Sequence, residues 1–213
     1  MSPRRRDPDG IAVSRAERRA EVLAAAADLF ASRGYAATTV REVAEAAGIL
    51  GGSLYYHFDS KESMADEILS SFLGEMWADY DRVTAAGLGP AETFRELIVS
   101  SFRSIDRHRA AVMMYQKETE HLAQNPRFGY LLESRRKFRE MWLTVLDKGV
   151  MDGTFRADLD TGLIYRFIRD TVWVAASWYR HDGPLPADEI ARQYITMTLD
   201  GILAGESLNA LLS

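Results

Sequence analysis

The stretch AAADLFASRGYAATTVREVAEAAGILGGSLYYHFDSKESMADEIL, residues 25–69, decides the fold of the chain. Its apolar residues recur at helical spacing in short runs, and Gly34 and Gly48 follow two of these runs, as is typical of helix C-termini. Thr38 and Thr39 precede the second run and favour a helix N-terminus there. Three short helices with a tight turn between the second and the third are typical of a helix-turn-helix.

The third helix, predicted at residues 52–58, has an apolar and a polar side. Leu54 and Phe58 are four residues apart, so both face the core of this unit. The outward residues are Gly52, Ser53, Tyr55, Tyr56 and His57. An exposed Tyr-Tyr-His group is unfavourable surface unless it contacts a partner. Because phenols and imidazoles donate to phosphates and tyrosine rings pack against thymine methyl groups, we expect this helix to enter the major groove of double-stranded DNA.

Two consecutive glycines begin this helix. Gly51 and Gly52 each cost about 1 kcal/mol of helix propensity relative to alanine. Glycine also lets the backbone approach a base edge closely. The pair therefore indicates a close contact at this point of the surface.

The blocks TTVREVAEAAGI and GSLYYHFDSKE resemble the TetR family of bacterial repressors. The resemblance covers residues 25–69 closely, and the whole chain by length and helix pattern. It implies that Gly51, Gly52 and Tyr55 occupy base-reading positions. The full set of predicted DNA-binding residues is Thr39, Arg41, Gly51, Gly52, Ser53, Tyr55, Tyr56, His57 and Lys61.

Within this set, the resemblance implies phosphate contacts by Thr39 and Lys61. Tyr56 and His57 would contact phosphates and also reach bases, and Arg41 would contact a phosphate or a base edge. The residues alone leave other roles open. Lys61 is alternatively an ordinary solvated lysine, His57 a hydrogen-bond partner of the first helix, and Arg41 a surface charge.

One residue departs from the family pattern. Leu50 stands where the family usually has Ser or Thr capping the recognition helix. The departure removes one expected phosphate contact together with the cap. We expect Ser53 to replace the cap in part.

The fold class is predicted as all-α, with helices at residues 14–34, 39–48, 52–58, 59–85, 91–107, 110–123, 130–151, 162–179 and 187–203. Ser14 and Glu17 form a predicted capping box at the start of the first helix. A disordered basic arm (1–13) precedes a three-helix DNA-binding domain (14–61) and a six-helix effector-binding and dimerisation domain (62–213). The arginines at positions 4–6 either reach along DNA or are an idle tail.

Charge is distributed unevenly around a net value of −5. Residues 1–61 contain nine basic and eight acidic residues, against 17 and 23 in the remainder. Positive charge therefore lies at the end that carries the motif, and the acidic remainder is repelled by DNA.

Composition excludes several other classes. The absence of cysteine rules out disulfides and thiolate metal sites, and fits a reducing cytoplasm. We find no signal peptide and no apolar run long enough to span a membrane. The chain has no Gly-rich phosphate loop, no G-x-S-x-G, no HExxH and no histidines at metal-ligand spacing, so we expect neither enzymatic activity nor a cofactor. A pure interaction module would not need the exposed Tyr-Tyr-His group.

The second domain is rich in methionine and aromatic residues, which suit a core and also an adaptable apolar pocket. Arg166, Arg169 and Trp173 occupy neighbouring positions on one predicted helix. An arginine in an apolar helix needs an acidic partner. That partner is either internal, Asp170 or Glu118, or an anionic effector. The predicted effector-binding residues are Arg169, Trp173, Arg166, Met113 and Trp142.

The segments NPRF, GTFRADLD, YRFIRDTVWVAASWYR and DGPLPAD resemble one branch of this family, the actinobacterial repressors of cholesterol ring catabolism. The resemblance implies a repressor that binds a palindromic operator as a homodimer, through the helices at 162–179 and 187–203. It also implies release by an acyl-CoA thioester of a steroid-ring fragment, bound near Arg169 and Trp173. A sensor of other fatty acyl-CoAs or of hydrophobic drugs is the alternative.

Overall fold

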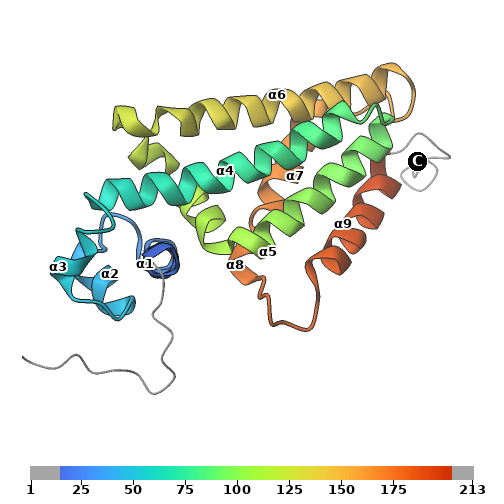
Figure 1. The fold of residues 1–213 in the computed structure, drawn as a ribbon. Helices are drawn as coiled ribbons and strands as arrows, with labels where there is room; N and C mark the ends of the chain where they lie inside the picture. The colour runs from blue at the N-terminus through green and yellow to red at the C-terminus, as the bar shows by residue number, and fades with distance from the viewer. Residues whose placement is uncertain (1–14, 203–213) are drawn as a thin grey trace, which may run out of the picture. The chain divides into compact units, whose positions relative to one another are not determined.

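The computed structural model describes residues 15–202, and the regular elements within that range are helices. Figure 1 shows these helices. The chain divides into two compact units, one ending at Ala65 and one beginning at Asp66. Helix α4 (Lys61–Ala85) begins in the first unit and continues into the second. The all-α prediction is confirmed, whereas the predicted arm (1–13), the Ser14 cap and the helix end at Leu203 lie outside the described residues.

The first unit contains α1 (Arg15–Arg33), α2 (Val40–Ala46) and α3 (Gly51–Leu54). Helix α2 packs against both α1 and α3. Apolar side chains from all parts of the unit form its core, chiefly Val22, Ala26, Phe30, Val43, Leu54 and Phe58. Leu54 and Phe58 are the two residues predicted to face this core.

The turn between α2 and α3 depends on Gly48. Its φ of +66° lies in the left-handed region, which glycine adopts without strain. The Gly48 N–H donates to the Glu45 carbonyl at 3.0 Å, and the Ile49 N–H donates to the Ala44 carbonyl at 2.9 Å. This pair of bonds is a Schellman motif, which ends α2 and leads directly into α3.

The second unit is arranged around α5 (Pro90–Leu122), which contacts α6 (Gly129–Met151), α7 (Thr161–Val172), α8 (Ala175–Trp178) and α9 (Ala187–Ile202). A short 3₁₀ helix (Pro126–Phe128) joins α5 to α6. Pro90 stands at the start of α5, where its missing N–H leaves no bond unmade.

One predicted boundary is confirmed and one differs. The helices predicted at residues 91–107 and 110–123 both lie within α5, where the non-helical dihedral angles of His108 (φ −129°, ψ 32°) separate them by a kink. The helix predicted at 162–179 is instead divided into α7 and α8. The Ala176 and Ser177 N–H groups donate to carbonyls only three residues back, at Trp173 and Val174, and this tighter turn interrupts the α-helix.

Aromatic rings make up much of the core of the second unit. The Phe138 ring lies 5.7–6.4 Å, centroid to centroid, from the rings of Trp77, Tyr80, Trp142, Tyr165 and Trp173. Because Phe138 is on α6 and these partners come from α4, α6, α7 and the residue that follows α7, its ring joins the helices around one point.

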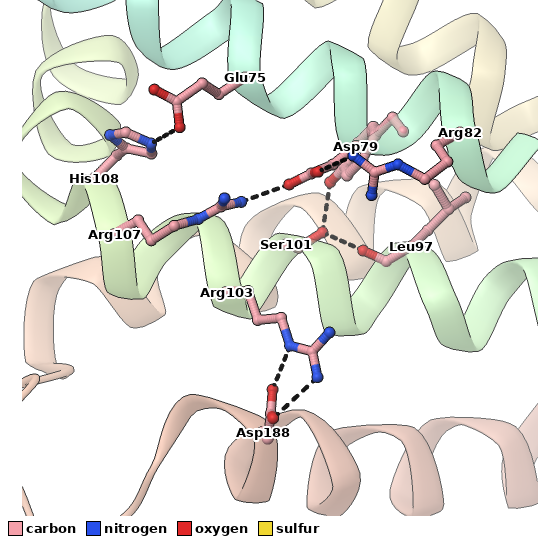
Figure 2. Close-up of polar contacts among 10 residues, drawn as sticks. Glu75, Asp79, Arg82, Leu97, Ser101, Arg103, Arg107, His108 and Asp188 are labelled. Atoms are coloured by element: carbon pink, nitrogen blue, oxygen red, sulfur yellow. Dashed lines mark hydrogen bonds and ion pairs between the residues drawn. The ribbon is translucent and has the colours of Figure 1, made fainter.

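Ion pairs join α5 to its neighbours at the surface of the second unit (Figure 2). Arg107 donates to Asp79 of α4 at 2.5 Å. Arg103 donates two hydrogen bonds, of 2.7 and 3.0 Å, to Asp188 in the first turn of α9. Exposed pairs contribute little stability individually, but the paired bonds at Asp188 orient the start of α9 on α5.

Candidate DNA-binding surface and effector cavity

The side chains predicted to read DNA gather around α3. Tyr55 and Tyr56 are 60% and 79% exposed, and both glycines at the start of α3 are exposed. Leu54 is fully buried and attaches α3 to the core. Gly52, Tyr55 and Tyr56 lie on the predicted outward side, whereas Ser53 and His57 are half-buried. Helix α3 ends at Leu54, and the tyrosines lie in the turn that follows it.

The fold itself requires neither glycine of α3. A Cβ atom added at Gly51 or Gly52 would meet no atom within 4 Å. Neither residue has the positive φ that favours glycine. Since each costs about 1 kcal/mol of helix propensity, the open backbone here points to the approach of a partner.

His57 and Arg41 retain groups that can reach a partner. The Nδ1 atom of His57 is enclosed, and it has no hydrogen-bond partner among residues 15–202. The structure therefore does not show the alternative bond to α1, and Nε2 is the ring nitrogen left to donate. Arg41 is exposed, and its guanidinium makes no ion pair within the described part of the chain.

Thr39 and Lys61, the predicted phosphate contacts, are engaged within the first unit. The Thr39 hydroxyl donates to the Glu42 carboxylate at 2.8 Å and accepts the Glu42 N–H at 3.2 Å, in the capping box of α2. The Lys61 ammonium donates to the carbonyls of Tyr35 at 2.9 Å and Thr38 at 3.0 Å. Lys61 is thus not a freely solvated lysine, and one of its three N–H groups remains for a phosphate.

Helix α3 begins at Gly51, and the side chain of its N-cap residue, Leu50, makes no capping hydrogen bond. The Ser53 hydroxyl makes no hydrogen bond with another residue in the described range, so the expectation that Ser53 partly replaces the cap is wrong. The physical reason is position. Ser53 lies on the third residue of the helix, beyond reach of the N–H groups that a capping residue satisfies.

The second unit contains a cavity of about 810 Å³ between α6 and α7, a volume typical of small-molecule sites. Its charged lining residues are Arg135, Arg136, Arg139, Arg166, Arg169 and Asp170. Its apolar and aromatic lining residues are Met76, Tyr115, Phe138, Tyr165, Trp173 and Val174. Arg135 pairs with Glu120, and Arg136 pairs with Glu133 and Glu140, three carboxylates outside the lining. The cavity therefore combines positive charge, part of it paired, with apolar surface.

The arginines of this cavity differ in their partners. Arg169 donates two hydrogen bonds to Asp170, of 2.6 and 2.9 Å, and these hold the pKa of the Asp170 carboxyl below its ordinary value. Of the two internal partners considered, Asp170 is the one observed. Arg139 and Arg166 make no ion pair or hydrogen bond with a residue in the 15–202 range. These two guanidinium groups are therefore free to pair with an anion.

Three of the five predicted effector-binding residues line the cavity: Arg166, Arg169 and Trp173. Met113 and Trp142 do not, and their assignment to the cavity is corrected. Trp142 is fully buried and packs edge-on against Phe94, at 5.5 Å between ring centroids, so it belongs to the core.

The arginines of α6 that line the cavity were not predicted from the sequence as effector-binding residues. The segment SRRKFRE (134–140) carries Arg135, Arg136 and Arg139 around Phe138. Arginines at positions i, i+1 and i+4 of a helix, beside an aromatic residue, are a detectable signal. Taken alone, however, such a run usually indicates a solvated helix face.

No helix within residues 15–202 is long and apolar enough to cross a membrane. The same residues contain no group of three or more His, Cys, Asp or Glu side chains that could hold a metal ion.

Both units match family models. Residues 22–68 match the model described as bacterial regulatory proteins, tetR family, and residues 87–202 match the tetracyclin repressor-like C-terminal domain. The chain belongs to the TetR family, whose N-terminal helix-turn-helix binds DNA.

Among its relatives, the chain is similar to the HTH-type transcriptional repressor KstR2 of Rhodococcus jostii. The identity is 52% over 185 residues, covering 87% of this chain and 91% of the relative. It is 48% identical to KstR2 of Mycobacterium tuberculosis, over 87% and 92% of the two chains. The solved structure of the ketosteroid transcriptional regulator KstR2 of Mycobacterium tuberculosis matches with a TM-score of 0.85 and 46% identity, over 92% and 100% of the chains. These relatives are repressors rather than enzymes.

Proposed function

We propose that the chain is a ligand-responsive repressor that binds a palindromic operator as a homodimer, in the cytoplasm, and is released by an acyl-CoA thioester of a steroid-ring degradation intermediate. The observation that carries the proposal is the arginine-rich, partly aromatic cavity between α6 and α7. A CoA thioester joins phosphates to an acyl group, and guanidinium groups and apolar walls suit these two parts. One relative is described as a ketosteroid regulator, which supports the steroid origin of the acyl group.

The lining of the cavity also argues against hydrophobic drugs, one of the two alternative classes of effector. A neutral hydrophobic drug would make no use of the Arg139 and Arg166 guanidinium groups, which are exposed and make no ion pair within the described residues. Other fatty acyl-CoAs carry the same phosphates, so the cavity alone favours them equally. The acyl group must therefore be distinguished by experiment.

Exposed apolar residues on the last helices support the homodimer. Phe167 of α7, Trp178 of α8 and Met197 of α9 are 57%, 56% and 69% exposed in the single chain. Large apolar groups on neighbouring helices are typical of a surface that a second copy covers. One recognition helix reads few base pairs, so a two-fold pair on a palindrome gives the specificity that a repressor needs.

Helix α4 is the proposed connection between ligand and DNA. It is continuous from Lys61, in the DNA-binding unit, through Met76, which lines the cavity. A ligand that displaces Met76 would change the position of α4. The shift in operator affinity equals the difference in ligand affinity between the two states, about 1–3 kcal/mol in many allosteric proteins.

Ligand release tests this proposal directly. A labelled fragment of the chain's own promoter, bound by the purified protein, would be titrated with a steroid-ring acyl-CoA, a fatty acyl-CoA, free CoA and an uncharged steroid. We expect the steroid-ring thioester to release DNA at the lowest concentration. An Arg139→Gln, Arg166→Gln double variant should keep its operator affinity and need at least about tenfold more thioester, because a charge-assisted hydrogen bond contributes about 1.5–3 kcal/mol.

Arg95→Gln, an exposed arginine of α5 outside the cavity lining, is the matched control and should respond as wild type does. Equal release by the uncharged steroid, or an unchanged thioester requirement in the double variant, would reject the anionic effector.

A further inference from the structure

Leu50 is the most unusual residue of the DNA-binding surface. Its side chain is 80% exposed, and its backbone is extended (φ −69°, ψ 140°) at the N-cap of α3. A Ser, Thr, Asp or Asn side chain at this position would accept a hydrogen bond from an N–H group of α3. Helix α2 of the same unit has such a cap, at Thr39. Local helix stability therefore does not explain the leucine.

The neighbours of Leu50 leave it accessible. Gly51 and Gly52 follow it directly, and the space that a Cβ atom would take at either residue is open. Tyr55 and Tyr56, one turn further on, are exposed as well. The leucine thus lies beside uncovered backbone, on the same element that the helix-turn-helix presents to DNA.

The chemistry of the side chain limits what it can contact on a duplex. Leucine donates and accepts no hydrogen bond, so neither a phosphate nor a polar base edge recognises it. In the major groove the one apolar group on the base edges is the C5-methyl group of thymine. We propose that Leu50 is a specificity-determining residue whose side chain packs against a thymine methyl group of each operator half-site. The inference rests on the proposed function, because it requires α3 to lie in the major groove.

Deoxyuridine provides the test, since it differs from thymidine only by lacking this methyl group. Synthetic operators would carry deoxyuridine at each thymine position in turn, and anisotropy titration would give the affinity of each duplex. We expect one position, repeated in the second half-site, where the replacement weakens wild-type binding about fourfold, the factor for burial of one methyl group. Replacement in both half-sites should weaken binding about fifteenfold.

The variants identify which residue senses the methyl group. Leu50→Ala should bind the thymine and deoxyuridine duplexes equally at that position. Tyr55→Ala should keep the deoxyuridine effect there, and so should Leu132→Ala, a control at an exposed leucine of α6.

Three results would overturn the inference: a flat deoxyuridine profile for the wild type, the same penalty in Leu50→Ala, or loss of the penalty in Tyr55→Ala instead. Binding of the unmodified operator is measured in the same series. A flat profile with intact binding overturns this inference alone, whereas absence of any operator binding overturns the proposed function.

Discussion

At the scale of single residues, the surface around α3 combines uncovered backbone with exposed phenols. The helical period is a local property, so the sequence was sufficient to predict Tyr55 and Tyr56 as exposed and Leu54 as buried. The bonds of Lys61 were not predictable in this way. Their acceptors are carbonyls 23 and 26 residues earlier, and only the folded chain brings them to the ammonium group.

The glycines of α3 give the first prediction. Gly51→Ala and Gly52→Ala should leave the free energy of unfolding unchanged or raise it by up to about 1 kcal/mol, because alanine restricts the unfolded chain and meets no neighbour. Operator affinity should fall about tenfold or more, since a methyl group holds the backbone away from the base edges. Chemical denaturation and anisotropy would measure the two effects. Operator affinity at the wild-type level would show that no close approach occurs.

Asp170 gives the second prediction, which rests on the proposed anionic effector. Its carboxylate competes with the ligand for Arg169, so Asp170→Asn should tighten effector binding. The gain should be at most about fivefold, because exposed ion pairs contribute about 0.2–1 kcal/mol. The concentration for half-maximal DNA release measures it, with Asp147→Asn on the exposed surface of α6 as control. Weaker binding in Asp170→Asn would assign the carboxylate a supporting role instead.

At the scale of elements, one carboxylate on α5 attaches the segment that follows α8. Asp106 accepts a 2.5 Å hydrogen bond from the Tyr179 hydroxyl and lies 2.7 Å from the Nδ1 atom of His181. The hydrogen bond and charge of Asp106 raise the pKa of His181. Burial raises the pKa of Asp106 itself, but the bonds from Tyr179 and His181 outweigh burial and lower it overall.

The third prediction concerns pH. The pKa of His181 is higher in the folded chain than in the unfolded chain, where it is 6.5. The pair of His181 with Asp106 therefore stabilises the fold fully at pH values below 6.5, and this stabilisation is lost as pH rises through the pKa of the folded chain. Asp106, with its lowered pKa, stays charged in mildly acidic solution. The Tm of wild type should therefore exceed that of His181→Gln at about pH 5–6 and converge with it at about pH 8–9. A difference in Tm that is constant across this range would exclude an ionic contribution.

The fourth prediction concerns the end of α6. A Cβ atom at Gly149 would lie 2.1 Å from a ring carbon of Phe155, which is itself buried. Gly149→Ala should therefore lower the free energy of unfolding by about 1–3 kcal/mol through overpacking. Gly74→Ala in α4, where the space is open, is the control and should not destabilise the chain. Equal stability of the two variants in urea denaturation would mean that Phe155 moves aside freely.

Of the two breaks in the helices of the second unit, the sequence predicted one and not the other. The break predicted between residues 107 and 110 is confirmed, because His108 has non-helical dihedral angles and the two parts of α5 meet there at a kink. The interruption after Val172 has no local sign, because Trp173 and Val174 keep ordinary helical dihedral angles and only the bonding pattern tightens. A change of this kind depends on packing rather than on propensity.

At the scale of the whole molecule, family resemblance predicted the division into a DNA-binding part and an all-helical remainder. It did not predict the composition of the cavity. Arg135 and Arg139 of α6 meet Arg166 of α7 only because the two helices pack together, and residues 152–160 separate those helices in the sequence. Met113 and Trp142 were wrongly predicted to line the cavity. An apolar residue buried in a core and one that lines a cavity have the same sequence pattern, and only the packing of the helices distinguishes them.

The central claim, that the surface of α3 binds DNA, is tested most directly by anisotropy titration of fragments from the chain's own promoter across a range of salt concentrations. Wild type should bind one fragment with an affinity that falls steeply with salt, as phosphate contacts require. A Tyr55→Ala, Tyr56→Ala variant of unchanged Tm should bind that fragment at least about tenfold more weakly. A wild-type chain that binds no fragment, or a double variant that binds as tightly as wild type, would contradict the account.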